Sequence, residues 1–174
     1  MTTAPIPRPA TPEDLPAIRV LHEANWRRDY AALVPPAVME ARLQARMEAY
    51  WAHGLPEGLT VVVVSDGVTI LGFVAFDPDR DGAVFIENLH VASAARGQGV
   101  GRALIRAVAQ TAPTLPIRLE VMDGNTAARA TYRAWGGQEG PAFDGGLLDH
   151  PQPERAVSWP SGAALIRALS ASAQ

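Results

Sequence analysis

Hydrophobic positions recur at helical spacing over the first third of the chain. Behind the segment Thr11–Asp14, the stripe that begins at Ile18 and Leu21 predicts a helix running to about Tyr30. The start fits a helix because a threonine can cap free N–H groups, proline suits the first helical position, and acidic side chains favour the positive end of the helix dipole. A second helix is predicted from about Pro36 to Trp51.

The pattern then changes to β-branched runs separated by turn residues. Runs of this kind are typical of buried strands, and they predict strands at residues 59–64, 69–76, 83–91, 117–122 and 155–159, after a short edge strand at 6–8. Asp66-Gly67 predicts a hairpin turn, because both central positions of the favoured turn require positive φ. A polar turn is predicted at 77–82.

Helical segments return in the second half of the chain, between the later strands. They are predicted at residues 101–112 and 125–135, and the second ends at Gly136-Gly137. The stretch 141–153, rich in Gly, Pro and Asp, predicts an irregular loop, and 161–174 predicts a weak alanine-rich tail. We see no repeat or linker, so we expect a single domain over residues 1–174, with its core at about 6–160, of the α/β class, or α+β by a stricter convention.

Composition excludes several kinds of chemistry. The chain of 174 residues is 48% hydrophobic and 19% charged, which is typical of a folded protein. It has no cysteine, and all 15 basic residues are arginine, so a thiolate nucleophile, a cysteine-ligated zinc site and lysine catalysis are excluded. A net charge of only -3 gives no sign of a nucleic-acid partner. Without a signal-like or membrane-spanning run, we expect a cytoplasmic protein with no membrane partner.

The most informative segment is Arg-Gly-Gln-Gly-Val-Gly-Arg at 96–102, between a predicted strand and a predicted helix. Glycines allow a tight turn and a close approach to a ligand. The free N–H groups of a first helical turn suit a pyrophosphate, and Arg96 and Arg102 can add charge-assisted bonds. The spacing fits neither the dinucleotide fingerprint nor the triphosphate loop. A tight loop that serves only helix–strand packing is the alternative.

This segment resembles the acyl-CoA-binding motif of the GNAT superfamily of N-acetyltransferases, Gln/Arg-x-x-Gly-x-Gly/Ala. Arg96, Gly99 and Gly101 stand at the defining positions. The resemblance implies a single mixed sheet of six to seven strands, flanked by about four helices and splayed between the strands at 83–91 and 117–122. It also implies that the pantetheine arm of the donor lies in that gap.

A second GNAT signature, Asn-x-x-Ala-x-x-x-Tyr-x-x-x-Gly, is matched by Asn125, Ala128, Tyr132 and Gly136. The likeness covers roughly residues 6–160 and implies acetyl-CoA as donor, with no metal. It also implies a donor site made of Leu89, His90, Val91, Arg96, Gly97, Gln98, Gly99, Val100, Gly101, Arg102, Asn125 and Tyr132.

Two side chains are candidates for the proton transfers. The resemblance makes Tyr132 the general acid that protonates the leaving thiolate; its position on one helical face with Ala128 and Trp135 also fits a core tyrosine. Glu87 is the candidate general base, since it alternates with Leu89 and Val91 on one strand face; a salt-bridged surface glutamate is the alternative.

Two further residues of these motifs have structural readings. By alternation His90 faces the opposite side of the strand, where a structural role is expected. Asn125 fits a helix cap as well as a cofactor ligand. Gly137 stands where the family usually has an aromatic residue, so we expect an altered strand after it.

The acceptor side is expected at residues 26–34 and at the stretch 141–153. There Asp144, Asp149 and Glu154 are placed either to attract a cationic amine or simply to be solvated. The sequence thus predicts an acyl-CoA-dependent N-acetyltransferase that acts on a small amine or a peptide N-terminus. A catalytically silent acyl-CoA-binding module is the alternative, a purely structural protein is a second, and a homodimer is left open.

Overall fold

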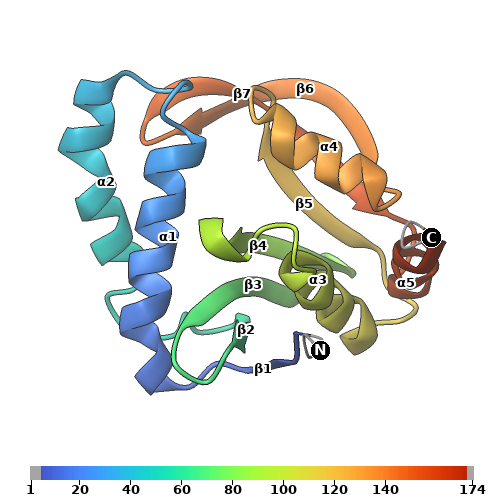
Figure 1. Ribbon diagram of the computed structural model, residues 1–174. Helices are drawn as coiled ribbons and strands as arrows, with labels where there is room; N and C mark the ends of the chain where they lie inside the picture. Colours follow the sequence, from blue (N-terminus) through green and yellow to red (C-terminus); the bar gives the residue numbers. More distant parts are fainter. Residues whose placement is uncertain (1–4, 172–174) are drawn as a thin grey trace.

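All six predicted strands join a further one in a single seven-stranded sheet in the computed structural model, which describes residues 5–171 (Figure 1). Its order is β1-β2-β3-β4-β5-β7-β6, and all neighbours are antiparallel except the parallel pair β4–β5. The strands are β1 (Pro7–Pro9), β2 (Thr60–Ser65), β3 (Ile70–Arg80), β4 (Ala83–Val91), β5 (Ile117–Met122), β6 (Gln138–Leu147) and β7 (His150–Trp159).

Within residues 5–171, five α-helices cover the two faces of this sheet. They are α1 (Leu15–Asp29), α2 (Pro36–Tyr50), α3 (Val100–Thr111), α4 (Thr126–Ala134) and α5 (Gly162–Ala171). Single 3₁₀ turns stand at Pro12–Asp14 and Ser93–Ala95. The predicted mixed, splayed sheet is confirmed, with one helix more than expected. Within residues 5–171, no helix is both long and apolar enough to cross a membrane.

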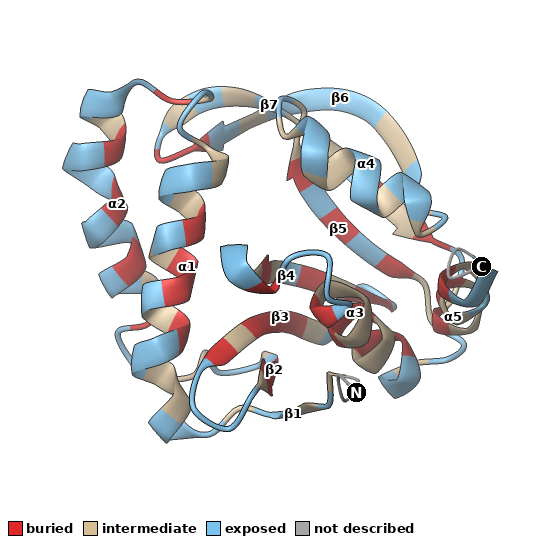
Figure 2. Ribbon diagram, in the orientation of Figure 1, coloured by how far each residue is buried: buried red, intermediate tan, exposed pale blue. Residues whose placement is uncertain are grey.

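The core explains why the run at 61–64 is apolar at every position. Val62 and Val64 pack with α3 and α5 on one face, whereas Val61 and Val63 pack with Ile18 of α1 on the other. A strand that is covered on both faces needs no polar side. The buried stripes of α1 and α2 point inward in the same way (Figure 2).

The predicted irregular loop at 141–153 is wrong, because β6 and β7 form a long antiparallel hairpin there. Proline is tolerated in strands at edges and bulges. Pro141 lies in a bulge between Glu139 and Ala142 of the edge strand β6. The carbonyl of Pro153 accepts a bond from Asp123 N at 2.8 Å, so this residue directs its backbone away from β6 and its missing N–H costs no hairpin bond.

The turn of this hairpin has no glycine. Leu148 and Asp149 both have φ of +55°, which ordinary side chains rarely adopt. Helix α2 holds the turn: Leu148 is buried against the α2 cluster, and Arg42 donates to the Leu148 carbonyl at 2.8 Å and pairs with Asp149 at 3.5 Å. Tertiary packing therefore imposes a turn that the local sequence does not indicate.

Two shorter differences concern the other hairpins. The predicted polar turn at 77–82 is mostly strand, because β3 continues to Arg80 and only Asp81-Gly82 form the turn. The connection after β2 takes four residues, in which the Asp66 carboxylate accepts the N–H groups of Val68 and Thr69 at 2.9 and 2.7 Å.

The C-terminal segment also differs from the prediction. Residues 162–171 form α5, whose Leu165 and Leu169 are fully buried in the main core against α3; residues 172–174 lie outside the described part. At Gly137, directly before β6, a side chain would meet Val157 and Trp159, so close packing favours glycine there.

Candidate active site

The parallel strands β4 and β5 separate partway along their length. Their pairing covers only Val84–Ile86 against Ile117–Leu119, although β4 continues to Val91 and β5 to Met122. A cavity of about 700 Å³ fills the opening. Its walls come from α1, α3, α4 and the β6–β7 hairpin as well as from the two strands.

The glycine-rich segment closes one end of this cavity. Gly97 and Gly99 have φ of +74° and +81°, and a side chain at either would meet nothing within 4 Å, so conformation and not space requires glycine there. Helix α3 begins at Val100, and the first helical bond runs from Ala103 N to Gly99 O at 2.9 Å. The N–H groups before Ala103 therefore have no partner within the helix and form an anion-binding end.

The polar side chains of this segment have different partners. Arg96 lines the cavity, and its Nη2 donates to both carboxylate oxygens of Asp29 at 3.0 and 3.2 Å. Arg102 also lines the cavity, but its guanidinium donates to the Leu169 carbonyl of α5. Gln98 does not line the cavity; its side chain bonds the Ala94 carbonyl at 2.7 Å.

The end of β4 offers backbone groups to the same cavity. In an antiparallel pair, successive residues direct their N–H and C=O groups alternately to either side. Ala92 N bonds Leu71 O of the β3 side at 2.8 Å. Leu89 and Val91 therefore direct their backbone groups away from β3, toward the gap left by β5, which suits an extended amide-containing ligand. The Val91 carbonyl already accepts a bond from Asn25 Nδ2 at 3.1 Å.

Tyr132 lies on α4 across the cavity from the glycine-rich segment. Its ring packs edge-on against Trp159 and beside Trp135, at 6.3 and 6.1 Å between centroids. Its hydroxyl makes no hydrogen bond with any residue of the described chain 5–171, and the residue lines the cavity. Burial, and secondarily the nearby Tyr30 and Asp29, raise the pKa of the Tyr132 phenol, which stays protonated at neutral pH.

The cap of α4 is Asn125, as the sequence predicts. Its side-chain oxygen accepts the Ala128 N–H at 3.2 Å, and the residue also lines the cavity. The cap therefore fixes the start of the helix that carries Tyr132. A capping role and a ligand-contacting role remain compatible.

Glu87 occupies a β-bulge, which the alternation argument did not foresee. Ile86 pairs with Phe76 and Asn88 with Ala75, so Glu87 is the extra residue between them. Its side chain lines the cavity and forms an ion pair with Arg80, whose guanidinium also stacks on the Phe85 ring at 4.2 Å. The carboxylate is therefore already paired with a cation.

A second carboxylate was missed in the sequence. Glu120 of β5 lines the cavity and makes no hydrogen bond or ion pair with any residue between 5 and 171. Partial burial and the nearby Glu154 and Glu87 raise its pKa. The signal was available: Ile117, Leu119 and Val121 alternate inward, which leaves Glu120 on the other face of a strand expected to border the gap.

The acidic residues proposed around 141–153 divide into two kinds. Glu154 lines the cavity, and its Oε1 accepts the Gly146 N–H at 3.0 Å. Asp144 and Asp149 do not line the cavity. Trp26 and Tyr30, from the stretch predicted to border the acceptor, also line the cavity. Burial first, then Asp29 and Glu154, raises the pKa of Tyr30 to about 12.

His90 lines the cavity from β4, with its ring buried toward α1. That ring lies 4.7 Å from the ring of His22 and 5.3 Å from that of Phe73. Burial lowers the pKa of His22 to about 2 and that of His90 to about 3, so both are neutral. His22 Nδ1 accepts a bond from Trp51 Nε1 at 3.1 Å. The pair forms a neutral polar layer beneath the site.

Comparisons with known proteins agree with this geometry. The profile of the Acetyltransferase (GNAT) family matches residues 18–136. A Mycobacterium tuberculosis protein named "Probable N-acetyltransferase Rv2775" is 23% identical over 130 residues, which is 72% of this chain and 75% of that protein.

Solved structures show the same fold. A histone acetyltransferase HPA2 and related acetyltransferase of Corynebacterium glutamicum superposes with a TM-score of 0.70 at 23% identity, over 91% of this chain and 97% of that one. The yncA protein of Salmonella typhimurium, solved with its cofactor acetyl-CoA, gives a TM-score of 0.61 at 17% identity, over 90% and 94%.

A splayed mixed sheet with an anion-binding helix start at the gap defines the acetyltransferase architecture, and the family match covers most of the chain. The chain belongs to the acetyltransferase (GNAT) family. It is therefore an acyl-CoA-dependent acetyltransferase.

Proposed function

We propose that this enzyme transfers the acetyl group of acetyl-CoA to a primary amine by direct attack, with Tyr132 as the general acid. One observation carries the proposal: a single cavity joins the anion-binding start of α3 to the Tyr132 hydroxyl and to the carboxylates of Glu87 and Glu120. A site for the donor, a proton donor and two proton acceptors thus share one space.

The donor end of the cavity suits both the pyrophosphate and the pantetheine arm of an acyl-CoA. The free N–H groups at the start of α3 and Arg96 suit the pyrophosphate. The outward backbone groups of Leu89 and Val91 suit the amides of pantetheine, which would then lie along β4 with the thioester near Tyr132. The structural neighbour from Salmonella typhimurium, solved with acetyl-CoA, supports this choice of donor.

The chemistry needs two proton movements. The neutral amine attacks the thioester carbonyl, a C–N bond forms, and the C–S bond breaks as the electron pair leaves on sulfur. The thiolate takes the Tyr132 proton, while the nitrogen releases a proton to a carboxylate or to water. The Tyr132 phenol is protonated at neutral pH, and its hydroxyl makes no hydrogen bond within residues 5–171 that would compete with the thiolate.

Of the two carboxylates, Glu120 is the better proton acceptor. The carboxylate of Glu87 is already engaged by Arg80, whereas Glu120 has no such partner among residues 5–171 and a raised pKa. A carboxylate is a stronger base when its pKa lies nearer the working pH. Glu87 then attracts and orients the amine, and it stays the alternative base.

The same carboxylates favour a cationic acceptor. Glu87, Glu120 and Glu154 come from three adjacent strands and line the same cavity as Trp26 and Tyr30. A protonated amine is drawn to such a site before it loses its proton. A small-molecule amine and a peptide N-terminus both satisfy this requirement.

Thermal unfolding with and without acetyl-CoA, followed by an amine library with detection of free thiol, tests the proposal. Acetyl-CoA at 100 times its dissociation constant stabilises the fold by about 2.7 kcal/mol. A shift together with thiol release for one class of amines is expected. A shift without release from any amine favours the silent binder, and no shift at saturating acetyl-CoA contradicts the choice of donor.

A further inference from the structure

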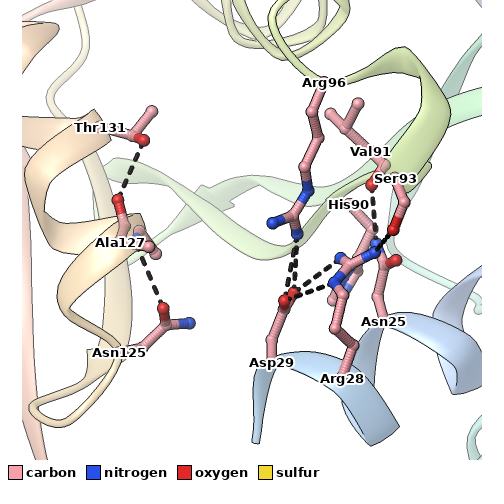
Figure 3. A network of polar contacts seen from close by, with 11 residues as sticks. Asn25, Arg28, Asp29, His90, Val91, Ser93, Arg96, Asn125, Ala127 and Thr131 are labelled. Atoms are coloured by element: carbon pink, nitrogen blue, oxygen red, sulfur yellow. Dashed lines mark hydrogen bonds and ion pairs between the residues drawn. The ribbon is translucent and has the colours of Figure 1, made fainter.

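One face of the last turns of α1 is bonded to the strand end and loop that carry the donor site. Asn25, Arg28 and Asp29 are spaced i, i+3 and i+4, which brings their side chains together on a helix. Asn25 donates to the Val91 carbonyl, Arg28 donates to Ser93 Oγ, and Asp29 accepts from Arg96 (Figure 3). Three successive points of the segment 91–96 are thus fixed by one helix.

Asp29 stands at the centre of this network. Its carboxylate accepts from Arg28 Nε and Nη2 at 2.8 and 3.1 Å, and from Arg96 Nη2 at 3.0 and 3.2 Å (Figure 3). Two cations therefore share one anion, and the cluster keeps a net positive charge beside the glycine-rich segment. Asp29 itself lines the cavity, and its charge contributes to the raised pKa of Tyr132.

Arg96 is held by only one of its three nitrogens. Nη2 bonds Asp29, while Nε and Nη1 make no hydrogen bond with any residue of 5–171. The side chain is 48% exposed, so without this partner its long stem would sample many rotamers. The contact with Asp29 limits these rotamers and leaves the other donors of the planar guanidinium available to an anion.

We propose that Asp29 is a positioning residue for the acyl donor: it holds Arg96 at the wall of the cavity, with the free edge of the guanidinium available to the pyrophosphate. This proposal rests on the proposed function, because it takes Arg96 as a ligand of the donor pyrophosphate and makes Asp29 the partner that orients Arg96. A carboxylate in this place by itself repels a pyrophosphate. The decisive question is therefore whether ordering of Arg96 outweighs that repulsion, and the pairing of Asp29 with two guanidiniums favours ordering.

The test is calorimetric titration of acetyl-CoA into the wild type, Asp29→Asn, Arg96→Ala and the double variant. Asp29→Asn is expected to raise the Kd about fivefold, the size of effect that a partly exposed ion pair gives. In the Arg96→Ala background the same change is expected to have no effect, because Asp29 acts through Arg96. In steady-state assays the KM for acetyl-CoA rises while kcat at saturation stays within about twofold.

Asp144→Asn is the matched control, because Asp144 is an exposed carboxylate that does not line the cavity, and we expect it to leave the Kd unchanged. Tighter binding by Asp29→Asn would overturn the proposal and make Asp29 a competitor of the donor. The proposal would also be overturned if Asp29→Asn lowered the affinity for acetyl-CoA equally in the Arg96→Ala background, because Asp29 would then act on the fold and not through Arg96. Absence of binding by the wild type would instead refute the choice of donor in the proposed function.

Discussion

The two ends of the cavity are built in different ways. The proposed donor end comes from one continuous segment, 89–102, and consists largely of backbone groups: the strand end, two glycines with positive φ, and the start of α3. The proposed acceptor end consists of side chains from β4, β5, β7 and α1, which are far apart in the sequence.

This difference has a consequence for how each end tolerates change. A backbone site depends on conformation, so it is sensitive to residues that alter φ and is indifferent to most side chains. A side-chain site depends on the charges and hydroxyls that meet in space, so single isosteric substitutions act on it directly. Variants can therefore affect one end and spare the other.

The largest effect is expected for Tyr132→Phe. Loss of a general acid typically costs about a hundredfold to ten-thousandfold in rate, so we expect turnover to fall about a thousandfold while the acetyl-CoA Kd changes little. The ring contacts with Trp135 and Trp159 survive the substitution. A timed assay of thiol release measures the turnover, and calorimetry measures the acetyl-CoA Kd. Tyr30→Phe, a second phenol of the cavity wall, serves as control; unchanged turnover in Tyr132→Phe would remove the acid assignment.

Glu120→Gln is expected to lower kcat/KM for the amine by about a hundredfold at neutral pH. The difference in kcat/KM between the wild type and Glu120→Gln should shrink as the pH approaches the pKa of the amine, because an amine that is already neutral needs no base. Glu87→Gln is the comparison, and its effect should be smaller and nearly independent of pH, because its carboxylate is paired with Arg80. A pH–rate profile for each variant separates the roles, and the reverse pattern would return the base to Glu87.

Gly99→Ala should weaken acetyl-CoA binding about tenfold, because a left-handed residue with a Cβ costs about 1–2 kcal/mol and the segment relaxes away from the anion-binding conformation. Gly67→Ala is a close control: Gly67 has φ of +96° and equally open surroundings, in the turn after β2. Both variants should lose similar thermal stability, but only Gly99→Ala should lose affinity. Equal affinities would contradict the role of the loop.

The smallest effect at neutral pH is expected for the contribution of His22 and His90, which lie beneath the cavity, to the stability of the fold. His22 and His90 have pKa values of about 2 and about 3 in the folded protein, below the ordinary value of 6.5, so the unfolded chain binds more protons as the pH falls. Stability is fully present above about pH 6.5 and falls below it by up to about 1.4 kcal/mol per pH unit for each histidine.

Urea unfolding between pH 8 and pH 5 measures this slope. In His22→Gln the amide oxygen can still accept the bond from Trp51, and one titrating group is lost, so the slope should be roughly halved. Asp14, with a pKa of about 2, contributes only in more acidic solution, below its ordinary value of 3.8. A wild-type stability that is flat from pH 8 to pH 5 would show that the histidines protonate without unfolding.

Sequence reasoning was most successful where structure is specified locally. The strand at 117–122, the helices of the first third of the chain and the Asn125 cap agree with the structure within a residue or two. It failed at 141–153 because prolines and glycines indicate a loop when only their neighbours in sequence are considered. In the structure they lie in the edge strand β6, in its bulge, and in β7, where Pro153 directs its backbone groups toward β5 and not toward β6.

The sequence by itself determined the family, the glycine-rich turn before α3 and the positions of Tyr132 and Asn125 on α4 and at its cap, because these depend on short-range spacing along one strand, loop or helix. Only the tertiary structure decided that Glu87 forms an ion pair with Arg80 and that Arg96 forms one with Asp29. It also decided that Glu120 lines the cavity without a polar partner among residues 5–171. Each of these depends on which side chains meet across different elements. That is fixed by the splay of β4 from β5, the bulge at Glu87 and the packing of α1 on the sheet.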